Sequence, residues 1–152
     1  MSYTFTQSFP YLLNRVGVRQ GELFGRRLSA FGVTLPMYRV MAVLRQQGEQ
    51  RLSELSSMTS IELSTLSRLV TTMKKAELIS RIRPETNGRT VEISLTAKGT
   101  TLVDRLMPVA AEFEAVGTLS LTEEEVAWLK AALNRIYDNL ETMEADPTKR
   151  TS

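Results

Sequence analysis

One stretch of the sequence sets short hydroxyl side chains around a single arginine. Leu66, Val70 and Met73 recur at helical spacing and predict a buried face through residues 63–75. The opposite face holds Ser64, Thr65, Ser67, Arg68, Thr71, Thr72 and Lys75. Small hydroxyls let a helix backbone approach the DNA major groove, and an arginine there can donate two hydrogen bonds to guanine. This face is therefore predicted to contact DNA. The alternatives are a solvated surface arginine at 68 and a backbone-bonded hydroxyl at 67.

A second group of basic residues follows within a predicted β-hairpin. Residues 78–83 and 89–95 alternate between apolar and polar side chains, and the run 84–88 between them contains the turn pair Asn87-Gly88. Asn87 and Arg89 would lie at the tip, from which a cation can reach the minor groove or a phosphate. Arg81 and Arg83 would supply further charge for phosphates. Arg89→Ala is expected to weaken DNA binding strongly without disturbing folding or dimerisation.

The elements that position these side chains follow one another in a recognisable order. Helices are predicted near 8–31, 34–47, 53–58, 59–75, 96–113 and 122–140. The expected caps are Ser8, Thr34, Ser53 and Thr96, with capping boxes formed by Thr59 with Glu62 and by Thr122 with Glu125. A short helix, a tight turn, a second helix and a hairpin make a winged helix-turn-helix. The predicted fold is mainly α with a small β-hairpin wing.

The composition excludes most catalytic chemistry. The 152 residues include no cysteine and no histidine, so the residues most used for nucleophilic catalysis, general-base catalysis and zinc binding are missing. No nucleophile motif or phosphate-cradling glycine loop is present. The sequence therefore predicts a protein that is not an enzyme and that uses no metal and no cofactor.

Charge and hydropathy indicate where the protein works. Residues 1–50 carry six arginines and two glutamates, whereas residues 118–152 carry four basic and seven acidic residues. A basic N-terminal segment and an acidic C-terminal segment fit a protein in which one region faces a polyanion and another region has a different role. The alternative is that the charges are scattered at random. Neither a secretory signal nor a run of about 18 apolar residues appears. We expect a cytoplasmic, nucleoid-associated protein without membrane contact.

From residue 51 to residue 102 the sequence resembles the MarR (multiple antibiotic resistance regulator) family of bacterial transcription factors. The matching motifs are Leu52-Ser53-Glu54-Leu55, then Ser64-Thr65-Leu66-Ser67-Arg68-Leu69-Val70, then Met73-Lys74-Lys75-Ala76-Glu77-Leu78-Ile79 against the family's L-x-x-K-G-L-I/V, then Arg89, Ser94-Leu95-Thr96-x-x-Gly99 and Leu121-Thr122-x-Glu124-Glu125. Each motif is weak alone, and together they are specific.

Three positions depart from the family pattern. The wing usually reads Asp-x-Arg, whereas this chain has Asn87-Gly88-Arg89 and thus an amide in place of the acid. Ala76 stands where a glycine is frequent, which predicts a less tight turn. Glu62 stands where many relatives place a basic residue. Because a carboxylate there would repel phosphate, its expected role is to cap the helix.

The resemblance implies a homodimeric regulator of double-stranded DNA. Its parts would be an N-terminal dimerisation helix (1–33), a winged helix-turn-helix domain (34–98), C-terminal dimerisation helices (99–146) and a frayed tail (147–152). Two recognition helices would meet half-sites about 10 bp apart in a pseudo-palindromic operator. Repression is the family default.

The resemblance also implies a pocket for a small aromatic acid or phenol, whose binding would release the operator. The candidate lining residues are Tyr11, Arg15, Arg19, Met37, Tyr38 and Arg39. An arginine would pair with the carboxylate. The alternative is that the arginines form ion pairs between subunits and the tyrosines belong to the core.

Two other classes of binding protein compete with a ligand-responsive regulator. A nucleoid or architectural protein would bind any DNA, with a steep salt dependence. A winged helix used only for protein interaction would not bind DNA, but Arg68, Arg89 and the pair Lys74-Lys75 argue against it.

Overall fold

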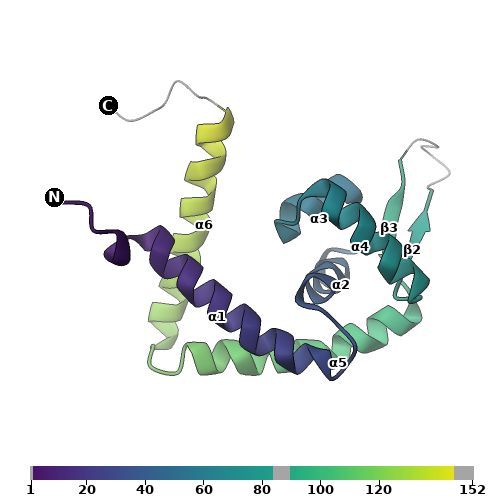
Figure 1. The fold of residues 1–152 in the computed structure, drawn as a ribbon, viewed down its shortest axis with the longest axis horizontal. Coiled ribbons are helices and arrows are strands. Elements are labelled where there is room, and N and C mark those ends of the chain that lie inside the picture. Colours follow the sequence, from purple (N-terminus) through teal and green to yellow (C-terminus); the bar gives the residue numbers. More distant parts are fainter. Residues whose placement is uncertain (1, 84–89, 146–152) are drawn as a thin grey trace. The chain divides into compact units, whose positions relative to one another are not determined.

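In a computed structural model of the chain, the described residues are 2–83 and 90–145. The fold is mainly helical with a small antiparallel sheet, as predicted from the sequence (Figure 1). The elements are a 3₁₀ helix η1 (Phe5–Gln7), α1 (Phe9–Ser29), α2 (Leu35–Gln47), β1 (Gln50–Arg51), α3 (Leu52–Thr59), α4 (Leu63–Lys75), β2 (Ile79–Ile82), β3 (Glu92–Leu95), α5 (Ala97–Gly117) and α6 (Glu123–Ala145).

The chain divides into two compact units after residue 113. The first unit contains α1 to α4, the sheet and most of α5. It also contains every buried apolar side chain of the described residues. The second unit contains the end of α5 and α6, and no described residue of α6 is buried. The four-part division proposed above remains a prediction.

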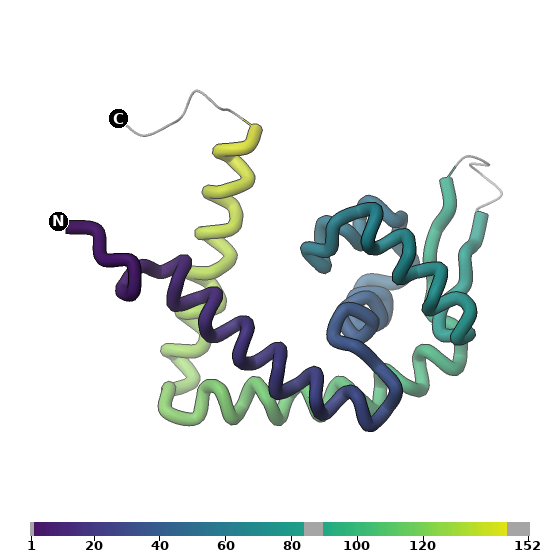
Figure 2. The backbone as a smooth tube through the Cα atoms, in the orientation of Figure 1, coloured from purple at the N-terminus to yellow at the C-terminus, as the bar shows by residue number. Residues whose placement is uncertain are grey.

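The core of the first unit forms around α2, which contacts α1, α3, α4 and β3. Figure 2 shows the chain passing from α2 through α3 into α4 and then into the hairpin. Side chains with almost no exposure come from seven elements: Leu28, Val40, Met41, Leu55, Leu66, Val70, Met73, Ile79, Ile93, Val103 and Leu106. Because α4 contributes three of them, its orientation is set by packing in this core.

The sheet has three strands in the order β1-β3-β2. The hairpin pairs Ile79 with Leu95 and Ile82 with Glu92, as expected for two alternating strands. On the other side of β3, Gln50 lies opposite Ile93. The strand β1 is absent from the sequence-based prediction because two residues are too few to show a period of two.

Three of the six predicted helix caps are confirmed by side-chain hydrogen bonds. The Thr34 hydroxyl accepts a hydrogen bond from the Met37 N–H (3.4 Å), and the Thr96 hydroxyl accepts one from the Gly99 N–H (3.0 Å). Thr122 and Glu125 form the predicted reciprocal capping box, at 2.8 and 3.2 Å. These signals were readable because each involves residues within one turn.

Three predicted cap bonds are not formed, although Ser8 does occupy the N-cap position of α1. The hydroxyl of Ser8 donates to the Phe5 carbonyl and makes no cap bond. Ser53 lies inside α3 and does not cap it. At the start of α3 the Glu54 carboxylate accepts a hydrogen bond from the Arg51 N–H (2.7 Å). Thr59 is the buried last residue of α3 and donates to the Leu55 carbonyl, so it cannot cap α4. In each case a nearby backbone carbonyl or another cap takes the place of the expected bond.

Candidate nucleic-acid interface

The helix α4 separates its side chains as the sequence pattern predicts. Leu66, Val70 and Met73 are buried. The predicted DNA-contacting residues Ser64, Thr65, Arg68, Thr71 and Lys75 are exposed, and Ser67 is half-buried. The outer face of α4 is thus available to a partner along its length.

Glu62 organises the start of α4. Its carboxylate accepts hydrogen bonds from the backbone N–H groups of Ser64 and Thr65, both at 3.1 Å, and from both hydroxyls. The Ser64 hydroxyl, followed by the two backbone groups, lowers the pKa of Glu62 to about 2. The cap role predicted for Glu62 is confirmed, but without Thr59 as its partner. The hydroxyl hydrogens of Ser64 and Thr65 therefore point to a neighbouring carboxylate.

The middle of α4 presents a free cation. Arg68 forms no ion pair and no side-chain hydrogen bond with any described residue. The nearby hydroxyls of Thr71 and Thr72 donate back to the helix carbonyls of Ser67 and Arg68, at 3.1 and 3.2 Å. Both threonines are exposed.

The end of α4 is a tight left-handed turn. Leu78 N–H donates to the Met73 carbonyl (3.1 Å) and Glu77 N–H to the Lys74 carbonyl (3.0 Å), the pattern of a Schellman motif. Glu77 has a φ of 60°, whereas Ala76 has an ordinary φ of −79°. The expected loosening at Ala76 is therefore wrong. The residue that replaces the usual glycine is Glu77, in agreement with a count back from Leu78 in the family motif.

The start of α5 holds this turn in place. The Thr96 hydroxyl donates to the Glu77 carbonyl (2.6 Å), and the Lys98 ammonium donates to the Ala76 carbonyl (2.9 Å). A Cβ built on Gly99 would lie 2.0 Å from the Leu78 carbonyl oxygen. Only glycine allows this approach, which explains the position of Gly99 in the motif.

The wing is joined to α4 at its base. The Arg81 guanidinium on β2 donates to the Thr71 hydroxyl (3.2 Å), so two of the predicted DNA-contacting residues bond to each other. Arg83 is exposed at the end of β2. Asn87 and Arg89 lie outside the described residues, and their predicted contacts remain predictions.

The six predicted ligand-contacting residues do not form one cluster. Tyr38 and Arg39 line a hollow of about 410 Å³ together with Ala42, Val43, Gln46, Met58, Thr59 and Ser60. Tyr38 also packs edge-on against Phe24, with ring centroids 5.0 Å apart, and burial raises the pKa of its phenol. Met37 belongs to the core. Residues of α3 that line the hollow could not be predicted from the sequence, because their position depends on how α3 packs against α2.

The three residues on α1 have other surroundings. Tyr11 packs against Phe5, with ring centroids 4.9 Å apart. Arg19 forms an exposed ion pair with Glu22 at 3.6 Å. Arg15 is exposed. None of the three lines the hollow beside Tyr38.

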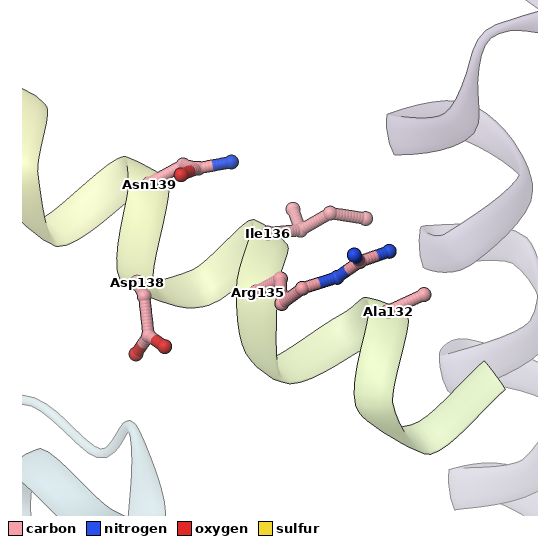
Figure 3. Close-up of a pocket in the computed structure, with 5 residues that line it drawn as sticks. All are labelled: Ala132, Arg135, Ile136, Asp138 and Asn139. Carbon is pink, nitrogen blue, oxygen red and sulfur yellow. The ribbon is translucent and has the colours of Figure 1, made fainter. Parts of the chain in front are cut away.

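A second hollow, of about 420 Å³, lies on α6. Figure 3 shows that its lining residues Ala132, Arg135, Ile136, Asp138 and Asn139 all come from this helix, with Asp138 directed away from Ala132 and Ile136. A hollow lined by one helix cannot surround a small molecule. It marks an uneven outer surface of α6.

Over residues 2–83 and 90–145, no group of three or more acidic side chains is arranged to hold a metal ion. Within the same ranges, each helix is too short or too polar to cross a bilayer.

Comparison with known proteins places the fold in one family. Residues 33–91 match the model of the MarR family. The HTH-type transcriptional repressor IacR of Pseudomonas putida is 30% identical over 138 residues, which are 90% of this chain and 83% of the relative.

Two solved structures show the same fold. One reports the regulation of DNA binding of Bordetella bronchiseptica BpsR by 6-hydroxynicotinic acid (23% identity, TM-score 0.81, 91% of this chain and 99% of that one). The other is the MarR C80S mutant of E. coli complexed with operator DNA (23% identity, TM-score 0.76, 89% and 99% coverage).

Proposed function

The chain belongs to the MarR family of transcriptional regulators, and from this premise we propose that it is a dimeric repressor released by a small aromatic acid. It is a regulator rather than an enzyme, because this family consists of regulators. The observation that carries the proposal is the outer face of α4, where Arg68 is exposed and unpaired among the described residues while the inner face is anchored in the core. A rigid helix with a free arginine can read base edges.

Exposed apolar side chains support a dimer. On α6, Trp128 is 66% exposed, and Leu129, Leu140 and Met143 are also exposed. On α1 the exposed apolar residues are Phe9, Leu12, Leu13, Val16, Val18 and Leu23. Apolar surface of this extent on two helices is typical of an interface between chains. A second copy would supply the two-fold symmetry that a pseudo-palindromic operator requires.

The DNA proposal is tested by fluorescence anisotropy with a duplex from the promoter region of the protein's own gene, at fixed salt. Wild type should bind this duplex more tightly than a scrambled duplex of the same composition. Arg68→Ala should lower the specific affinity about tenfold or more, as expected for loss of a base contact. Arg89→Ala should also weaken binding, and both variants should keep wild-type thermal stability.

The matched control is Arg135→Ala, which removes one positive charge from α6. It should leave the affinity for both duplexes close to wild type. Equal affinity of wild type for all DNA, with a steep salt dependence, would instead support an architectural protein.

We place the effector in the hollow beside Tyr38. Val43, Ala42 and Met58 supply apolar walls, and the exposed Arg39 supplies a cation for a carboxylate. Ser60, with a φ of 55°, lies in the turn that leads to Glu62 and α4. A ligand that displaces this turn would move the start of the recognition helix and thereby lower operator affinity. The proposal is supported by the structural neighbour BpsR, whose DNA binding is regulated by 6-hydroxynicotinic acid.

The effector proposal is tested by adding 6-hydroxynicotinic acid and other hydroxylated aromatic acids to the operator complex, with each acid's amide as the uncharged control. An active acid should release the operator, its amide should not, and Arg39→Ala should abolish release while sparing DNA binding. Arg15→Ala and Arg19→Ala test the alternative on α1. If they abolish release and Arg39→Ala does not, the pocket lies on α1. If no acid releases the operator, the effector proposal is wrong, and the proposal that the protein is a DNA-binding regulator is unaffected.

A further inference from the structure

The start and the middle of the DNA-facing side of α4 differ in hydrogen-bonding character. At the start, Glu62 Oε2 accepts three hydrogen bonds, from the Ser64 hydroxyl and from the Thr65 hydroxyl and N–H, whereas Oε1 accepts from the Ser64 N–H alone among the described residues and keeps a free acceptor site. All three residues are exposed. One turn later, Arg68 presents only donors and has no partner among the described residues.

We propose that Glu62 is a specificity-determining residue, whose carboxylate accepts a hydrogen bond from the 4-amino group of one cytosine in each operator half-site. This inference rests on the proposed DNA interface and adds to it a residue whose expected role was only that of a cap. Ser64 and Thr65 act as positioning residues, because their hydroxyls hold the carboxylate at the start of α4.

The chemistry of the base edges selects cytosine. In the major groove guanine presents two acceptors and thymine presents an acceptor and a methyl group, all of which a carboxylate avoids. Adenine presents an amino group beside the N7 acceptor, which repels a carboxylate. Cytosine presents its amino group without a neighbouring acceptor, so it is the base that a charged acceptor tolerates best.

Arg68, which has no partner among the described residues, makes an acidic residue at the start of α4 compatible with DNA. A carboxylate alone would be repelled by the phosphates and would lower affinity for all sequences. Arg68 compensates for this by donating to the acceptors of a guanine in the same half-site. The half-site should therefore contain both a cytosine and a guanine.

The first experiment selects tight binders from a randomised duplex pool with wild type, Glu62→Gln and the control Glu125→Gln. Glu125 is also a capping glutamate, but it lies in the first turn of α6. Wild type and Glu125→Gln should select a cytosine at one position of each half-site. Glu62→Gln should lose the preference for cytosine there by about tenfold or more, with adenine gaining, because an amide pairs with the N6 and N7 atoms of adenine. Its affinity for unrelated DNA should rise, because one negative charge is removed.

The second experiment leaves the protein unchanged and so does not depend on the variant folding. The selected cytosine is replaced by 2-pyrimidinone, which lacks the 4-amino group. Wild type should bind this duplex about tenfold more weakly, and Glu62→Gln should discriminate far less. An unchanged consensus for Glu62→Gln together with unchanged wild-type affinity for the 2-pyrimidinone duplex would overturn the inference while leaving the regulator intact. If wild type selects no sequence at all, the proposed function itself fails.

Discussion

The helices α4 and α6 share two features and differ in what covers them. Each has a capping glutamate, Glu62 before α4 and Glu125 in the first turn of α6, and each carries an apolar stripe. α4 buries Leu66, Val70 and Met73 within its own chain, whereas no described residue of α6 is buried. An apolar stripe therefore predicts burial without saying in which chain the covering surface lies.

Gly99→Ala should destabilise the first unit, with the largest effect of the substitutions proposed here. The added methyl group would lie 2.0 Å from the Leu78 carbonyl oxygen, and a backbone atom in a packed turn cannot move aside. We expect a loss of about 3 kcal/mol or more in the free energy of unfolding, measured by urea denaturation. Gly25→Ala is the control, because its new Cβ meets no atom within 4 Å in a helix interior. It should be neutral or stabilise by up to about 1 kcal/mol.

The dimer should be broken by the double substitution Leu129→Glu and Leu140→Glu in α6. Both leucines are exposed in the single chain. They lie on the apolar stripe of α6, which consists of Val126, Leu129, Leu133, Ile136 and Leu140. Burying two carboxylates in an interface is strongly unfavourable, so the dissociation constant of the dimer should rise about 100-fold or more in sedimentation experiments. Operator affinity should fall with it.

The control for this pair is Asn134→Glu, which adds a charge at an exposed position of α6 away from the stripe. It should remain dimeric. A double variant that stays dimeric at micromolar concentration would mean that the stripe of α6 is not the interface.

Glu77→Gly, in the turn after α4, should increase the free energy of unfolding. Glu77 adopts a left-handed φ of 60° at the position that glycine occupies in most such turns. Glycine removes a steric cost of about 1 kcal/mol, and the variant should gain up to that amount in thermal or urea unfolding.

The end of α1 provides the reverse test. There Gly32 has a φ of 68°, so Gly32→Ala should lose about 1 kcal/mol. A destabilised Glu77→Gly would show that the side chain has a role of its own.

The smallest effect concerns the pH dependence of the α4 cap. The pKa of Glu62 is lowered to about 2 from 4.5, so the carboxylate stabilises the folded state fully above pH 4.5 and loses this effect as pH falls towards 2. The stability difference between wild type and Glu62→Gln should be constant from pH 8 to pH 5 and shrink at pH 3. Urea unfolding at each pH measures it. A difference that already shrinks between pH 6 and pH 5 would contradict the hydrogen bonding described for Glu62.

Much of the fold could be read from the sequence because its signals are local. The helical stripes and the reciprocal pair Thr122 and Glu125 each involve residues a few positions apart. The hairpin followed from alternation on both sides of a turn run. The buried and exposed faces of α4 were predicted correctly for the same reason, since a helix fixes which residues share a face.

The candidate site was predicted less completely. Thr59 and Glu62 have the spacing of a capping box, but packing of Leu55 and Thr59 extends α3 and leaves the cap to Glu62 alone. The bond between Arg81 and Thr71 joins two elements. The hollow beside Tyr38 needs Met58 and Ser60 from another helix. Such contacts between elements leave no periodic trace in the sequence.

The sequence alone was enough to predict the six α-helices, the hairpin, their order, the exposed face of α4 and the family to which the chain belongs. These depend on interactions within one or two helical turns, which the spacing of residues specifies directly. The tertiary structure alone decided that Glu62 holds both hydroxyls at the start of α4, that Glu77 is left-handed and that Gly99 lies against the Leu78 carbonyl. Each of these depends on where a neighbouring element ends, and that is set by close packing of the whole core.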